Sequence, residues 1–164
     1  MESLVLDLWD SGLSFDLKNI AGGHHADSEG MMTATDVVAL YEAPPIELGE
    51  APVVMFRIPR LWRRGMNPND LYEATKGWWR IDLQRAKKAK YALAVSKGVV
   101  REVYEPKSRR KREQGELGWS VAEVNRPRYG FEGRTAYGVD AWRNKNVLAF
   151  LPPGFQGTHR YHRC

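Results

Sequence analysis

The fold is decided by the stretch Tyr91-Ala92-Leu93-Ala94-Val95-Ser96-Lys97-Gly98-Val99-Val100-Arg101-Glu102-Val103-Tyr104-Glu105. It contains two runs rich in apolar and β-branched residues, which are typical of strands. Between them, Gly98 can take the positive φ that a tight turn requires. The stretch therefore predicts a β-hairpin with strands over residues 91–95 and 99–105.

Further elements are expected on both sides of this hairpin. Residues 53–58 have the composition of a strand. Asn67 can cap a helix that begins at Pro68 and ends before Gly77, and residues 84–90 predict a second, short and basic helical turn. Three more strands are expected over residues 119–124, 129–134 and 147–151. This order of elements predicts an α+β fold, a small mixed and partly closed β-barrel with one or two short helices.

The two parts of the chain differ in charge, and the change falls near Pro52. Residues 1–52 contain ten acidic residues and one lysine, a net charge of −9, whereas the remainder carries +14 within a total of +5. The prolines and glycine of residues 43–50 predict a linker. We therefore expect an acidic N-terminal arm over residues 1–50 and a basic domain over residues 51–164. Within the arm, Thr35 could cap a segment ending near Tyr41, but periodicity does not decide whether that segment is helix or strand.

A domain of charge +14 repels itself unless it meets a polyanion, and nucleic acid is the commonest one. A merely solvated cationic surface is the alternative interpretation. The acidic arm then suggests an intramolecular cover that competes with nucleic acid. A segment for self-association or for a protein partner would explain it equally well.

The composition also bears on where the protein works. No window approaches 18 uncharged apolar residues, so no membrane span is expected, and the acidic start of the chain does not resemble a secretory signal. The single cysteine, Cys164, cannot form an internal disulfide. These observations favour a cytoplasmic protein.

A cluster of cations follows the hairpin and is the first candidate binding site. Five of the six residues from 107 to 112 are basic, and we expect them to form a mobile loop tip that contacts phosphates: Lys107, Arg109, Arg110, Lys111 and Arg112. Phosphate contacts raise affinity but carry no sequence information.

The second candidate site is aromatic and centres on Trp78-Trp79-Arg80, directly after the first helix. Adjacent residues of an extended segment point to opposite faces, so we expect one tryptophan in the core and the other facing a groove. Stacking of a base on such a ring contributes about 1–3 kcal/mol. Packing alone would also explain the tryptophans of the basic part.

Signs of catalytic chemistry are weak. His159 and His162 lie near Cys164, but a zinc site normally needs four ligands from separate segments. No partner carboxylate can be assigned to make His162 a general base, and no P-loop, GxSxG or HExxH motif is present. We therefore predict no metal, no cofactor and no catalytic residue.

Several strings of the basic part resemble a group of uncharacterised bacterial proteins, over about residues 53–164. These strings are LYEATKGWWR at 71–80, AKYALAV at 89–95, GVVREVY at 98–104 and RYGFEG at 128–133. The order of elements is similar to the PUA-like superfamily, which includes EVE, ASCH, YTH and SRA-type domains. Residues 151–155 depart from the pattern expected for the closing segment.

The resemblance implies that the domain reads a single flipped or modified base in an aromatic pocket, at an extrusion cost of a few kcal/mol. Trp78, Trp79, Tyr104 and Trp119 would form the pocket walls, and Arg80 and Asp82 would supply polar contacts. Arg128, which opens the last string, completes the expected nucleic-acid-binding set. The resemblance further implies a role in restriction or defence, or in their regulation.

Three functional hypotheses remain at this point. The first is a non-catalytic nucleic-acid-binding module, with DNA preferred to RNA as the partner. The second is a small nuclease or RNase toxin, and the third is a protein-interaction or regulatory factor.

Overall fold

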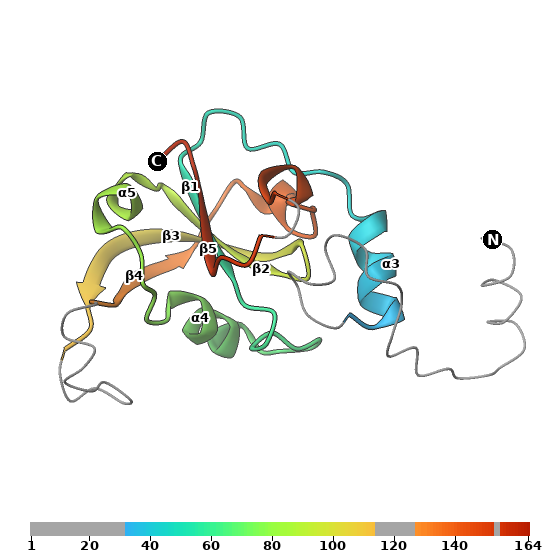
Figure 1. Ribbon diagram of the computed structural model, residues 1–164, viewed down its shortest axis with the longest axis horizontal. Helices are drawn as coiled ribbons and strands as arrows, with labels where there is room; N and C mark the ends of the chain where they lie inside the picture. The colour runs from blue at the N-terminus through green and yellow to red at the C-terminus, as the bar shows by residue number, and fades with distance from the viewer. Residues whose placement is uncertain (1–31, 114–126, 153–154) are drawn as a thin grey trace, which may run out of the picture.

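A five-stranded mixed sheet is the centre of the computed structural model, which describes residues 32–113, 127–152 and 155–164 (Figure 1). The strands lie in the order β4-β3-β2-β1-β5. They are β1 (Val53–Arg57), β2 (Tyr91–Ser96), β3 (Val99–Lys111), β4 (Tyr129–Thr135) and β5 (His159–His162). β1 runs parallel to β2, and every other neighbouring pair is antiparallel. The predicted α+β class is confirmed, and the described sheet is open, with β4 and β5 as its edges.

The predicted hairpin is the pair β2–β3. Its turn residues Lys97 and Gly98 have φ values of 53° and 72°, which suit the right-handed twist of the two strands. Glycine is needed at 98 for a second reason, since a Cβ there would lie 2.8 Å from Cδ1 of Leu40.

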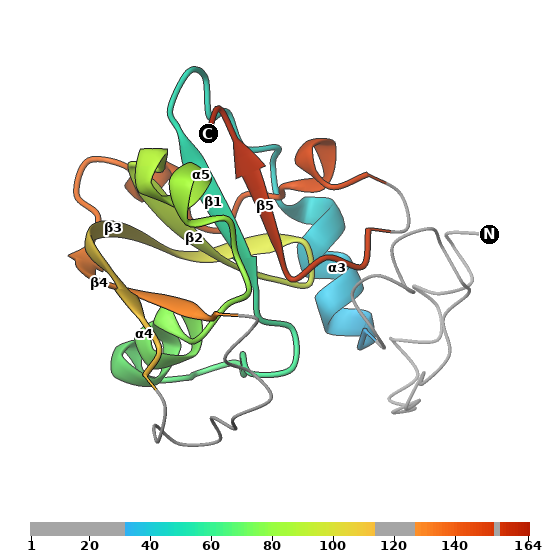
Figure 2. The same ribbon diagram turned by 60° about the vertical axis from the view of Figure 1, so that its left-hand side comes forward.

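β3 continues well beyond the predicted hairpin. It pairs with β4 as far as Lys111, with an irregularity between Pro106 and Ser108. The two strands form a long, curved ribbon (Figure 2). The mobile loop tip expected at residues 107–112 is therefore wrong: residues 107–111 are strand, because β4 satisfies their backbone groups.

Each α-helix in the described part of the chain begins at a side chain that accepts backbone N–H groups. Thr33, rather than Thr35, caps α3 (Ala34–Glu42), in a capping box with Asp36. Asn67 caps α4 (Pro68–Lys76) as predicted, and Asp82 caps α5 (Leu83–Lys88). Two short 3-10 helices follow β4, η2 (Asp140–Trp142) and η3 (Leu148–Phe150).

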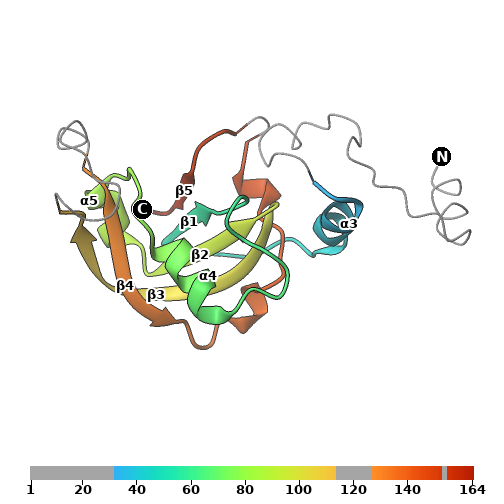
Figure 3. The ribbon, with the colours of Figure 1, turned by 90° about the horizontal axis from the view of Figure 1, so that it is seen from below.

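Both faces of the sheet are buried. Along β1, Val53 and Met55 belong to one core cluster, whereas Val54 and Phe56 belong to another. The second cluster includes Leu71 of α4, and α4 lies across this face of the sheet (Figure 3). Burial of both faces explains why the strand signal of residues 53–58 is a continuous apolar run rather than an alternation.

Two expectations for the connecting segments are corrected. The predicted linker is packed, since Ile46 and Leu48 are buried in the first cluster and Pro45 forms a bridge to Asn146. Residues 147–151 contain η3 instead of a strand. The strand expected over residues 119–124 and most of the acidic arm lie outside the described residues. In the described part, no helix is long and apolar enough to cross a membrane.

Candidate nucleic-acid interface

The distal half of β3 carries the predicted cation cluster as part of a paired strand. Lys107, Arg110 and Lys111 are exposed, Arg109 is half-buried and Arg112 is buried. We call residues 107–112, together with residues 129–133 of β4, the basic ribbon. Pairing with β4 fixes the spacing of these cations, which a mobile loop would leave variable.

Trp78 lies beside this ribbon and contacts two of its arginines. The guanidinium carbon atoms of Arg110 and Arg112 lie 5.5 Å and 5.9 Å from the centre of the Trp78 ring. These distances lie within the range of cation–π attraction. Arg128 donates from Nη1 to the Trp78 carbonyl oxygen over 3.3 Å. The half-buried indole therefore lies beside two arginines, and a third arginine bonds to the backbone of the same residue.

The end of α4 approaches β4 closely at Gly130. A Cβ at this position would lie 2.8 Å from the Gly77 carbonyl oxygen and 3.1 Å from Cζ3 of Trp78. Only glycine leaves room for this approach, so Gly130 allows the Trp78 ring to pack against the ribbon.

Trp79 has the opposite environment. Its ring stacks on Phe56 with 4.9 Å between centroids, and its Nε1 donates to the Thr75 carbonyl oxygen over 2.8 Å. Its backbone N–H and C=O each bond to Tyr129 over 2.8 Å. The two tryptophans are both half-buried and differ in their neighbours: Trp79 packs against the second core cluster, whereas Trp78 belongs to none of the described core clusters.

Arg109 joins the ribbon to α5. Its Nη2 donates to the Ala86 carbonyl oxygen over 3.0 Å, and its guanidinium carbon lies 5.7 Å from the centre of the Phe131 ring. Burial lowers the pKa of Arg109. A half-buried guanidinium that donates to a helix carbonyl is poorly placed to contact phosphate, so Arg109 chiefly holds α5 against β3.

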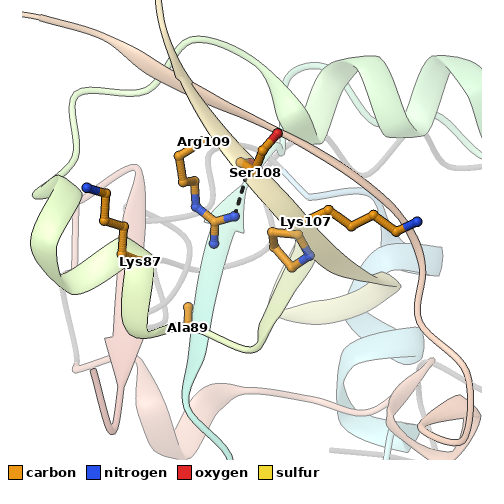
Figure 4. A pocket seen from close by; sticks show the side chains of 6 residues that line it. Lys87, Ala89, Lys107, Ser108 and Arg109 are labelled. Atoms are coloured by element: carbon orange, nitrogen blue, oxygen red, sulfur yellow. Dashed lines mark hydrogen bonds between the residues drawn. The ribbon is translucent and has the colours of Figure 1, made fainter.

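An open depression of about 180 Å³ separates α5 from the ribbon. Figure 4 shows Lys87 extending from α5 on one side of Arg109, whereas the Lys107 side chain points away on the other side. The depression is lined by Lys87, Ala89, Pro106, Lys107, Ser108 and Arg109. Lys87 is absent from the site predicted from the sequence. The basic residues of α5 are the sequence feature that could have indicated Lys87. Only the contact between Arg109 and Ala86 shows that this helix adjoins the ribbon.

The other predicted site residues are dispersed. Tyr104 is only 2% exposed and packs edge-on against Tyr72, so the expectation that it lines a base pocket is wrong. Asp82 caps α5, accepting from the backbone N–H groups of Gln84 and Arg85 at 2.8 Å and 3.2 Å. Arg80 is exposed, and Trp119 lies outside the described residues.

The C-terminal histidines belong to the edge strand β5. His162 Nε2 lies 2.9 Å from the Gly49 carbonyl oxygen, and Cys164 Sγ lies 3.5 Å from that of Val53. Within residues 32–113, 127–152 and 155–164, no group of three or more His, Cys, Asp or Glu side chains could hold a metal ion.

Comparison of the chain with protein-family models, with curated proteins and with solved structures gives no match.

Proposed function

We propose that the chain binds nucleic acid through the basic ribbon without catalysing a reaction. Lys107, Arg110 and Lys111 contact phosphates, and the Trp78 ring stacks on an unpaired base. The observation that carries this proposal is the position of Trp78, a half-buried indole beside Arg110 and Arg112 at a strand that carries exposed cations. A positively charged track with an adjoining aromatic platform is the usual arrangement for binding unpaired nucleic acid.

In the proposed contact, the base stacks on one ring at an open surface and is not enclosed by several rings. Of the four rings expected to enclose a base, Trp79 and Tyr104 pack in the core, which leaves Trp78 among the described residues. An unpaired base is available in single strands or after flipping from a duplex. The PUA-like, partly closed barrel, the preference for DNA, the reading of a modified base and the link to defence remain finer parts of the proposal.

Binding to labelled single-stranded DNA, single-stranded RNA and duplex DNA, measured over a series of salt concentrations, tests the proposal. The double variant R110Q/K111Q removes two phosphate contacts and should reduce the log–log salt slope by about 1.4–1.8. The control K145Q/R160Q removes the same charge from residues outside the ribbon. Equal slopes for the two double variants would contradict the assignment of phosphate contacts to the ribbon.

The stacking contact has its own variant. Trp78→Ala should weaken binding to single strands about tenfold, which corresponds to about 1.4 kcal/mol, and leave the salt slope unchanged. Unchanged affinity would remove the base contact and leave plain phosphate binding. Cleavage of any probe in the presence of Mg²⁺ would overturn the non-catalytic part of the proposal.

A further inference from the structure

A second basic cavity lies away from the ribbon, where three segments meet. It has a volume of about 360 Å³ and is lined by the start of α3, the loop after β1 and the β2–β3 turn. The lining residues are Thr33, Thr35, Asp36, Trp62, Arg63, Arg64 and Lys97. None of these residues belongs to the basic ribbon or adjoins Trp78 in the chain, so the two sites share no residue.

Arg101 of β3 lies next to this cavity and is incompletely bonded. Its guanidinium carbon lies 3.9 Å from the centre of the Trp62 ring, so the two groups form a close cation–π pair. Its Nε and Nη2 atoms are buried and have no hydrogen-bond partner. These two N–H groups lie on one edge of the guanidinium, the edge that binds two oxygen atoms of a phosphate or carboxylate in parallel.

Two further arginines at the cavity lack partners. The side chains of Arg63 and Arg64 are exposed and form no hydrogen bond or ion pair with any residue that the structure describes. Burial lowers the pKa of Arg101, Asp36 raises it, and Arg64 lowers it. The carboxylate of Asp36 already accepts the backbone N–H of Thr33 over 3.2 Å. Two arginines therefore share the cavity lining with one carboxylate, and the charges of Asp36 and Arg64 both act on Arg101 beside it.

Such a cluster is costly in the absence of a ligand. Unbonded buried donors carry a desolvation penalty, and like charges that lie close together repel each other. A bound dianion would offset both costs, and the excess of cations favours a doubly charged phosphate over a carboxylate.

We propose that this cavity binds a phosphate monoester group, held by Arg63, Arg64 and Arg101. Trp62 lines the cavity and covers one face of Arg101, which fixes the orientation of this guanidinium behind the ring. The site is independent of nucleic-acid binding by the basic ribbon. The phosphate comes either from a free small molecule or from the 5′ end of a nucleic acid.

Calorimetric titration of the full chain in buffer free of phosphate and sulfate tests this site. The probes are inorganic phosphate, adenosine monophosphate and adenosine, followed by a short oligonucleotide with and without a 5′-phosphate. We expect saturable binding of adenosine monophosphate and none of adenosine. A preference for the phosphorylated oligonucleotide over adenosine monophosphate would identify a nucleic-acid end as the source, and the reverse order would identify a small molecule.

Three variants assign the site. R101M should abolish binding of adenosine monophosphate and, by removing an unbonded buried charge, raise the melting temperature in ligand-free buffer. R63Q/R64Q changes only exposed side chains, so it should fold normally and weaken binding at least tenfold. R160Q, at an exposed arginine of β5, is the matched control and should bind as the original chain does. No saturable binding to the original chain, or equal binding by all three variants, would overturn the proposal. R110Q/K111Q should lose nucleic-acid binding and still bind adenosine monophosphate. Failure of the ribbon proposal is therefore distinguishable from failure of the cavity proposal.

Discussion

The ring of Trp79 stacks on Phe56 and donates to the last turn of α4, whereas its neighbour Trp78 contacts arginines of β3. Two adjacent and chemically identical residues therefore have different roles. The indole of Trp79 packs against the second core cluster, whereas the indole of Trp78 lies beside the basic ribbon.

The stabilities of the two alanine variants should differ accordingly. Trp79→Ala removes the stacking on Phe56 and the hydrogen bond to Thr75, so it should lower the free energy of unfolding by about 3 kcal/mol. Trp78→Ala should cost less than about 1.5 kcal/mol, since its ring belongs to none of the described core clusters. Urea unfolding followed by circular dichroism measures both values. Equal losses would contradict the assignment of Trp79 to the core.

The sequence predicts that Trp78 and Trp79 have different environments, but not which of the two rings packs against the core cluster. Alternation along an extended segment requires opposite faces. The choice between them depends on Phe56 and Tyr129, which are distant in the chain, so local pattern cannot decide it. The prediction that Tyr104 lines a base pocket is wrong for a similar reason, because α4 covers its face of the sheet and places Tyr72 against it.

Among the elements, β3 is the one whose extent is least predictable from composition. A proline and five cations resemble a loop, yet the segment pairs with β4 to Lys111. Gly133, the partner of Pro106, permits the pairing, since a Cβ there would lie 2.3 Å from the Glu105 carbonyl oxygen. By contrast, α4 was predicted with its cap, because the signals for a helix start lie within a few residues of one another.

β5 leads to a prediction about pH. Burial, and next the charge of Arg85, lower the pKa of His159 below its ordinary value of 6.5. Between the folded and the unfolded pKa, the folded chain binds fewer protons, so stability falls as the pH falls below about 6.5. The loss is complete once the pH is below the folded pKa.

The variant His159→Gln should remove this contribution. The melting temperatures of the variant and the original chain, compared from pH 5 to pH 8, should therefore differ in slope below about pH 6.5. His162→Gln is a control in the same strand. Parallel curves for His159→Gln and the original chain would show that His159 does not govern acid stability.

For the whole molecule, the change in charge predicts a boundary near Pro52. The packed part of the chain begins earlier than this boundary, nearer the N-terminus. Leu40 and Ala43 pack with Val99, and Ile46 and Leu48 lie in the core beneath the sheet. Composition could not show this, because prolines and acids dominate the segment and only a few apolar side chains enter the core. The remaining excess of acids, a net charge of −5, lies in residues 1–31.

Two truncations separate the roles of these segments. Removal of residues 1–31 should preserve the melting temperature and strengthen nucleic-acid binding, since the net charge rises from +5 to +10. Removal of residues 1–50 should also lower the melting temperature, because Ile46 and Leu48 are lost from the core. Melting curves and binding isotherms measure both effects. Weaker binding after the shorter truncation would contradict an acidic arm that competes with the ligand.

The pairing of β1 with β5, which joins Val53 to His162, has a consequence for how the chain folds. The β2–β3 hairpin can form early from neighbouring residues, but β1 gains its second partner only after a long loop closes, which is entropically costly. Topologies dominated by such distant contacts fold slowly. Until β5 docks, one backbone edge of β1 is exposed, so the last step of folding is also the step at which the chain is most prone to aggregate.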